Sequence, residues 1–163
     1  MRKIKLLLSY DGTPYQGWQK QPGLATIQGS LETVLTQLYN EPVRVIGSGR
    51  TDAGTHAVGQ VAHFEAPKIL RSEDKLLRGL NALLPETIAV KSLWLAPDDF
   101  HALASARRKT YIYRIWNHPV RSALWNHRAL HVPHPLNLAF LNTLARQVVG
   151  RRDFKSFQTT GTL

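Results

Sequence analysis

The sequence predicts an α+β protein built on a split β-α-β-β-α-β sheet of the ferredoxin-like or RRM-like kind, with the helices on one face. Two patterns predict it: segments in which apolar and polar residues alternate, and two intervening stretches with apolar residues at helical spacing. The composition is that of an ordinary folded protein, since 43% of the 163 residues are hydrophobic and 20% are charged. Cysteine is absent, which excludes a disulfide scaffold, a thiol nucleophile and cysteine-ligated metal sites.

The first half of this unit begins with a strand. Ile4, Leu6 and Leu8 alternate with polar neighbours, as in a strand with one buried face. A helix follows after a loop, because its leucines and valines recur at helical spacing behind a potential capping residue. The expected elements, in order, are a strand ending at Tyr10, a turn at 11–14, a helix capped by Thr26 and stopped by Pro42, and a short strand over 43–46.

The second half repeats this order after a glycine-rich loop at residues 47–54. Acidic residues follow Ser72 directly, where the dipole of a helix favours negative charge. The expected elements are a strand over 58–64, a helix capped by Ser72 and ended by Pro85, and a strand over 88–95. Residues 1–103 therefore form the predicted ferredoxin-like domain that carries the glycine-rich loop.

A second, similar α/β lobe is expected to begin near residue 104. Residues 109–116 alternate in character, which predicts a long strand with Tyr111 and Tyr113 on one face. Residues 117–135 contain three prolines and four histidines and are expected to form a loop. Asn137 is placed to cap a third helix that ends at Gly150. Residues 104–163 are thus predicted to be the incomplete start of this lobe.

Charge is distributed unevenly along the chain. The net charge is +10, and residues 101–163 carry 10 of the 21 basic side chains but only one of the 11 acidic ones. Such asymmetry favours a polyanionic partner, above all a nucleic acid. The alternative is a basic tail that aids solubility or contacts anionic lipid. The apolar runs are far shorter than the roughly 20 residues that span a bilayer, so we expect no membrane insertion. The absence of cysteine favours a cytoplasmic location.

The loop at 47–54 is the strongest candidate for chemistry. Its three glycines surround Arg50, Thr51 and Asp52, and glycine lets backbone approach a ligand closely. An exposed carboxylate beside an arginine suits a nucleophile or a general base. The alternative is a hairpin connection with an incidental charged tip. A phosphate-binding loop is excluded, because the Gly-Lys ending and the following helix are missing.

Other polar residues give weaker signals. Asp11 is expected to shape a turn. Asp98 and Asp99 near His101 form either a metal-binding pair or a capping loop, and the loop is favoured. The histidines after residue 117 lack metal-ligand spacing, so we predict no metal site.

Aromatic residues offer a further candidate surface. Tyr111 and Tyr113 lie beside Arg107, Arg108 and Lys109, and such a patch stacks on unpaired bases while its cations hold phosphates. The alternative is that both tyrosines belong to the core. Trp18 is equally open to two interpretations, a packing anchor or a stacking platform.

Several short motifs together resemble a known family. They are Tyr-Asp-Gly at 10–12, Gly-Trp-Gln at 17–19, Gly-Arg-Thr-Asp-Ala-Gly-Thr-His-Ala at 49–57, Gly-Gln-Val at 59–61, His-Phe at 63–64, Asp-Phe-His-Ala at 99–102, residues 108–113, Asp-Phe at 153–154 and Ser-Phe at 156–157. In this order they are similar to the tRNA pseudouridine synthase A family, over nearly the whole chain. The block at 49–54 is the most specific, and the others support it.

The resemblance implies an enzyme that isomerises uridine to pseudouridine in the anticodon stem-loop of tRNA, without a cofactor or an essential metal. It implies that Asp52 is the catalytic aspartate, which attacks the ribose C1′ or the base C6 of a flipped uridine or otherwise assists glycosidic cleavage. Tyr111 matches the tyrosine that stacks on the target base and is a candidate base for the last proton removal. Arg50 matches the arginine that enters the vacated space. Lesser RNA contacts are expected from Trp18, Gln19, His56, His101 and Arg108.

The resemblance also sets two limits. Leu103 stands where the family often has an arginine, so one RNA contact is expected to be weaker. Family members run well past residue 163 and are typically homodimers, so we expect this chain alone to be inactive or very weakly active. The competing interpretations are a non-catalytic RRM-like RNA-binding module, which has no need of Asp52, and a structural or interaction fragment of a larger enzyme.

Overall fold

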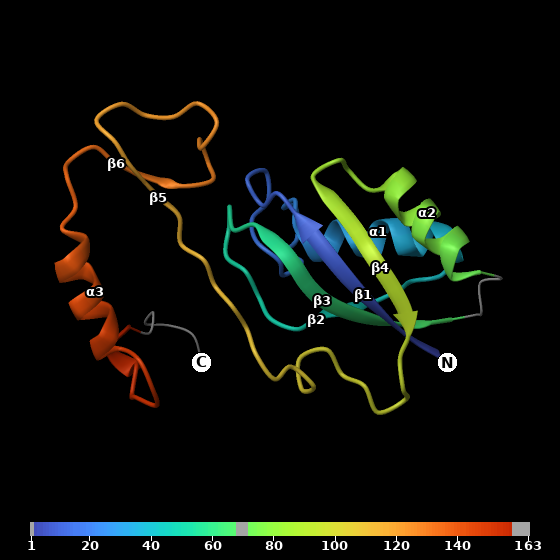
Figure 1. The fold of residues 1–163 in the computed structure, drawn as a ribbon. Coiled ribbons are helices and arrows are strands. Elements are labelled where there is room, and N and C mark those ends of the chain that lie inside the picture. Colours follow the sequence, from blue (N-terminus) through green and yellow to red (C-terminus); the bar gives the residue numbers. More distant parts are fainter. Residues whose placement is uncertain (1, 68–71, 158–163) are drawn as a thin grey trace. The chain divides into compact units, whose positions relative to one another are not determined.

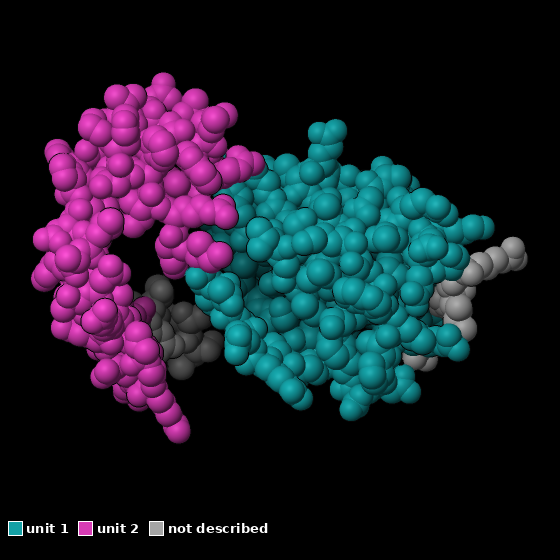
Figure 2. Space-filling model, in the orientation of Figure 1, with its two compact units in different colours: residues 1–111 teal, residues 112–163 magenta. Residues whose placement is uncertain are grey.

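The computed structural model describes residues 2–67 and 72–157. The chain divides into two compact units, residues 1–111 and 112–163 (Figure 2). The boundary between these units follows Tyr111. The predicted domain boundary at residue 103 stays a prediction.

Unit 1 is built on one antiparallel sheet. Its strands are β1 (Arg2–Tyr10), β2 (Val45–Gly47), β3 (Ala57–Ala66) and β4 (Ile88–Leu95), in the order β2-β3-β1-β4. Two helices, α1 (Ile27–Tyr39) and α2 (Glu73–Leu83), lie on the same face of the sheet (Figure 1). This is the split β-α-β-β-α-β arrangement, so the predicted fold class is confirmed.

The core lies between the sheet and the helices. Leu6 and Leu8 of β1 are fully buried there and pack in one cluster with Phe64 of β3 and Leu31 of α1. The alternate residues of β1 point to the opposite face, where Lys5 opposes His63 across the β1–β3 pair. The alternation seen in the sequence therefore separates a core face from a second, partly open face.

A buried polar network fixes β2 against α1. The Glu32 carboxylate accepts hydrogen bonds from the Val45 backbone N–H (3.0 Å) and from the Gln28 side chain (2.9 Å), and it pairs with Lys20 (3.0 Å). Gln28 also donates to the Val45 carbonyl (3.0 Å). Because these partners satisfy the carboxylate, its burial costs little, and β2 is held where the glycine-rich loop begins.

The helix ends follow the predicted chemistry in part. Thr26 caps α1, since its hydroxyl accepts from the Gly29 N–H (3.2 Å). The helix ends before Pro42, because Asn40 adopts a left-handed conformation with φ of 55°. Ser72 occupies the cap position of α2 but makes no side-chain cap hydrogen bond.

Unit 2 contains β5 (Ile115–Asn117) paired in parallel with β6 (Leu130–Val132), then α3 (Leu138–Gln147) and a 3-10 turn (Lys155–Phe157). The Asn137 side chain accepts from the Phe140 N–H (3.0 Å), as the capping prediction requires. The helix ends at Gln147, before the predicted end at Gly150. No helix in residues 2–67 and 72–157 is long and apolar enough to cross a membrane.

Two predictions for this region are wrong. The long strand over 109–116 is absent, because residues 107–114 have no regular secondary structure and only Ile115–Asn117 form β5. A strand needs a neighbour to pair its backbone groups, and alternation by itself does not supply one. The expected loop at 117–135 contains β6, which provides that neighbour for β5 only.

The core predicts a clear contrast between two leucine substitutions. Leu31→Ala removes a fully buried side chain of α1, and we expect it to lower the free energy of unfolding by about 3 kcal/mol. Leu83→Ala in α2 is the control, because 43% of that side chain is exposed, and its effect should stay below about 1 kcal/mol. Urea unfolding followed by circular dichroism measures both, and equal effects would contradict this core.

Candidate active site

Two loops meet at one end of the sheet, the loop that follows β1 and the loop between β2 and β3 (Figure 1). The Trp18 N–H donates to the Thr51 carbonyl (2.9 Å), and the Gly54 N–H donates to the Tyr15 carbonyl (3.2 Å). These two bonds flank Asp52, whose side chain is exposed. The candidate carboxylate thus sits in water on a loop whose backbone is held from both sides.

The close approach of the two loops depends on glycine. Gly17 has φ of +87°, and a Cβ at this position would lie 2.6 Å from the Thr51 carbonyl oxygen. A Cβ on Gly12 would collide with the Thr55 carbonyl. The spacing of Gly12 and Gly17 therefore has a physical reason: each lets the loop after β1 contact backbone of the Asp52 loop.

Trp18 belongs to the core of this end of the sheet. Its side chain is 3% exposed, and a Cβ on Gly47 would lie 2.6 Å from the indole ring. The Tyr10 ring packs beside it at 6.3 Å between centroids. The structure therefore favours the packing interpretation of Trp18 over a stacking platform, and the neighbouring Gln19 is exposed.

Tyr10 links the core to the candidate loop. Its hydroxyl lies 2.9 Å from the Thr51 hydroxyl, so a hydrogen bond joins the end of β1 to the residue before Asp52. Burial raises the pKa of Tyr10, the Thr51 hydrogen bond acts in the opposite direction, and the nearby Tyr111 phenol raises the pKa further. Tyr111 itself is 64% exposed.

Cationic side chains gather at the same loop. Arg50 is exposed within it. The Lys109 amino group lies 3.0 Å from the position that a Cβ on Gly49 would occupy. The structure therefore brings Asp52, Arg50 and Tyr111 to one end of unit 1, and Lys109 joins them. Arg108, also exposed, precedes Lys109 in the same extended stretch.

His56 and Asp11 connect the two loops on another side. The His56 Nδ1 lies 3.1 Å from the Asp11 carboxylate and 3.2 Å from the Gly12 N–H. One nitrogen cannot donate and accept at once, so the contact with Asp11 is a hydrogen bond when Nδ1 carries a hydrogen, and the contact with Gly12 is one when it does not. Asp11 also accepts from the Thr13 N–H (3.0 Å) and hydroxyl (2.6 Å), which confirms its predicted role in a turn.

His101 lies apart from this cluster, against His63 on the partly open face of the sheet. The sequence places Tyr10 at the end of a strand and Thr51 in the glycine-rich loop, but it does not predict the hydrogen bond between them that supports the loop. The available signal was the position of Tyr10 at the end of the alternating strand, where an inward hydroxyl needs a partner.

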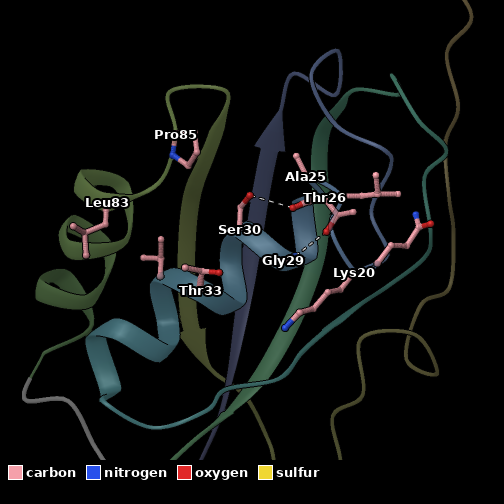
Figure 3. Close-up of a pocket in the computed structure, with 11 residues that line it drawn as sticks. Lys20, Ala25, Thr26, Gly29, Ser30, Thr33, Leu83 and Pro85 are labelled. Carbon is pink, nitrogen blue, oxygen red and sulfur yellow. Dashed lines mark hydrogen bonds between the residues drawn. The ribbon is translucent and has the colours of Figure 1, made fainter.

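A groove of about 440 Å³ lies elsewhere, between the start of α1 and the end of α2 (Figure 3). It is lined by Lys20, Gln21, Leu24, Ala25, Thr26, Gly29, Ser30, Thr33, Val34, Leu83 and Pro85. None of the candidate residues contributes to it. Across the described parts of the chain, no cluster of three histidine or acidic side chains is arranged to hold a metal ion.

Fold and site together define a ferredoxin-like α+β protein with an exposed aspartate loop set among aromatic and cationic side chains. Sequence comparison then identifies the particular family. The pattern of the tRNA pseudouridine synthase family matches residues 7–103, and this chain belongs to that family.

Individual relatives extend the similarity beyond residue 103. A tRNA pseudouridine synthase A from Maridesulfovibrio salexigens is 43% identical over 162 residues, which cover 99% of this chain and 59% of the relative. The proteins of the same name from Ruminiclostridium cellulolyticum and Rhodopseudomonas palustris are 44% and 46% identical, over 99% and 98% of this chain and 65% of each relative. The chain therefore spans roughly three-fifths of the length of these relatives.

The close approach of the loops predicts unequal effects of two glycine substitutions. Gly17→Ala and Gly23→Ala both place a side chain at positive φ, +87° and +72°, but only Gly17 faces neighbouring backbone. We expect Gly17→Ala to lower the free energy of unfolding by about 1–3 kcal/mol more than Gly23→Ala. It should also shift the amide resonances of residues 51–54. Equal destabilisation with unshifted resonances would show that the loops do not interlock.

Proposed function

We propose that this chain is the part of a tRNA pseudouridine synthase that carries the catalytic aspartate, Asp52. The substrate is a uridine in the anticodon stem-loop of tRNA, and the enzyme acts in the cytoplasm as a homodimer. Residues 1–103 form the domain with the catalytic loop, and residues 104–163 begin the second lobe. One observation carries the proposal: Asp52 is exposed, yet the loop around it is held by the Trp18–Thr51 and Gly54–Tyr15 hydrogen bonds.

The reaction is an isomerisation that balances without a co-reactant. The bond between N1 of the base and C1′ of the ribose breaks, the base rotates, and a bond between C5 and C1′ forms. The proton on C5 is lost, and N1 takes up a proton. Asp52 starts the sequence by attacking C1′ or C6, or by assisting cleavage of the glycosidic bond. A loop held by its neighbours suits this step, because little reorganisation is then needed to present the carboxylate.

The surrounding side chains suit the handling of a flipped nucleotide. Flipping a base out of its stack costs a few kcal/mol, which a stacking partner and a filler of the vacated space offset. The exposed ring of Tyr111 is accessible to a base, and the exposed Arg50 lies two residues from Asp52. Tyr111 is also the candidate base for removal of the C5 proton. His56, Gln19 and His101 are assigned lesser RNA contacts.

The basic stretch after residue 106 supports RNA binding. Arg107, Arg108 and Lys109 are consecutive and exposed. Cations of this kind hold the phosphate backbone of RNA. A non-catalytic RNA-binding module has the same cations, so binding alone does not distinguish it from an enzyme.

The decisive substitution is Asp52→Ala, with Asp98→Ala as the matched control at another exposed acid. The assay measures pseudouridine in an anticodon stem-loop RNA by chemical labelling and mass spectrometry. It uses the 163-residue chain and the chain extended by the C-terminal part of the Rhodopseudomonas palustris relative. We expect little product from the short chain, because the relatives are longer, and clear product from the extended one.

In the extended form, Asp52→Ala should remove the product while RNA affinity stays within about threefold, whereas Asp98→Ala should keep both. Product from Asp52→Ala would contradict the assigned role. If neither parent form makes product but both bind the RNA, the non-catalytic module is favoured instead.

The salt dependence of RNA binding tests whether the basic stretch contacts phosphates. Phosphate contacts release counterions, so the affinity for the stem-loop should fall steeply as salt rises. Arg108→Ala should lower the slope of log K against log salt by about one. Arg78→Ala is the control, because Arg78 is an exposed arginine on α2, on the helical face of the sheet. Fluorescence anisotropy at several salt concentrations measures the slopes, and equal slopes for the two variants would contradict the assignment.

A further inference from the structure

His63 is a buried histidine that the proposed chemistry does not use. It lies on β3, its side chain is 2% exposed, and it faces away from the helices. Phe100, His101 and Ala102 lie against it, and they belong to the stretch 96–106 that follows β4, called here the covering segment. Two hydrogen bonds anchor the start of this covering segment to Lys3: the Ala96 N–H donates to the Lys3 carbonyl (2.9 Å), and the Lys3 amino group donates to the Asp98 carbonyl (2.6 Å).

The centre of the covering segment is held by His63 itself. The Ala102 N–H donates to the Nδ1 of His63 (3.2 Å), and Ala102 is 2% exposed. The imidazole also meets the rings of Phe100 and His101 edge-on, at 5.7 and 5.0 Å between centroids. The amino group of Lys5, the β1 residue opposite His63, lies over the Phe100 ring at 5.5 Å.

This arrangement requires a neutral imidazole. An Nδ1 that accepts from Ala102 carries no hydrogen, so the proton is assigned to Nε2. Protonation at Nδ1 would set an N–H against the N–H of Ala102. It would also place a charge in a buried position, which is unfavourable without a partner. The contact between Ala102 and His63 therefore holds only while His63 is uncharged.

The surroundings of His63 also favour the neutral form of its imidazole. Burial lowers the pKa of His63, the neighbouring His101 and Lys3 lower it further, and Glu65 and a backbone hydrogen bond with Ile46 oppose them. Once the covering segment is released, the imidazole meets water and its pKa returns toward about 6.5. Protons therefore bind more readily to the released state, and falling pH below about 6.5 favours release.

The covering segment leads directly to the candidate active site. Residues 107–111 continue from it without regular secondary structure, so no strand pairing sets their course. This stretch reaches the aspartate loop at Lys109, which lies beside Gly49, and Tyr111 follows two residues later. The stretch that bears Tyr111 thus continues directly from the segment that His63 holds, and it passes the aspartate loop at Lys109.

We propose that His63 is a positioning residue: its neutral imidazole anchors the covering segment through Ala102, keeps Tyr111 beside the aspartate loop, and releases both on protonation. The part that concerns substrate rests on the proposed function, because it takes Tyr111 as the residue that stacks on the base. The anchoring itself is independent of that function.

Hydrogen exchange by NMR tests the anchor in the 163-residue chain. The protection factor of the Ala102 amide is measured from pH 7.5 to 5.5, relative to amides of β1 that report global unfolding. In the parent chain it should fall by about tenfold over this range, as the released state takes up a proton. The Tyr111 amide resonance should move over the same range.

Three variants separate the possible causes. In His63→Asn the side-chain oxygen replaces Nδ1 as acceptor but does not titrate, so protection should persist and become independent of pH. In His63→Leu no acceptor remains, so protection of Ala102 should be low at every pH while the β1 amides stay protected. His101→Asn is the matched control for the adjacent histidine, and it should keep the pH dependence of the parent.

Several outcomes would overturn the proposal. In the parent chain, they are protection of Ala102 that does not change with pH and a Tyr111 resonance that does not move. In the variants, they are a pH dependence that persists in His63→Asn, one that disappears in His101→Asn, and full protection of Ala102 in His63→Leu. None of these readouts needs RNA chemistry. If the Asp52 assay fails but Ala102 shows the expected hydrogen exchange, the proposed anchor is retained. If the assay succeeds but Ala102 does not show that exchange, only the anchor is rejected.

Discussion

The backbone hydrogen bond from Trp18 to Thr51 is the contact on which the candidate site depends. It forms only because Gly17 leaves room for the Thr51 carbonyl and because the indole of Trp18 rests directly on Gly47. The core of the sheet therefore extends up to the residue before Asp52. An exposed acid at a loop tip would ordinarily be mobile, but here the packing of a buried tryptophan sets the backbone beneath it.

The central strand β1 connects this end of the sheet with the other. One face of β1 supplies Leu6, Leu8 and Tyr10 to the core, and Tyr10 also reaches the hydroxyl of Thr51. The other face presents Lys5, which lies under Phe100 of the covering segment. The alternation of apolar and polar residues that predicted β1 thus also gives the two faces of the strand different structural roles. The core-facing residues support the aspartate loop, and the others support the segment that leads to Tyr111.

The elements that local periodicity determines could be predicted from the sequence. The alternation in β1 and the spacing of apolar residues in α1 specify their elements directly, and the confirmed fold class follows from their order. The prediction of a strand over 109–116 was wrong, because strand pairing depends on a neighbouring strand distant in the sequence, which local alternation cannot reveal. The place of Trp18 could not be predicted for a similar reason, since its burial depends on a missing side chain at Gly47, far along the chain.

The same sheet carries two polar groups in opposite surroundings. Asp52 stands in water at the end of the sheet, where a carboxylate can reach a large substrate. His63 is enclosed on the sheet face, where an imidazole can accept a hydrogen bond but cannot take up a proton without losing it. The stretch over 96–111 begins at Lys3, contacts His63 through Ala102 and continues to Lys109 beside Gly49 of the aspartate loop. Because residues 107–111 lack strand pairing of their own, the course of this stretch depends on the contacts of the segment before it. A single backbone N–H, that of Ala102, thereby links a buried histidine to the stretch that reaches the aspartate loop.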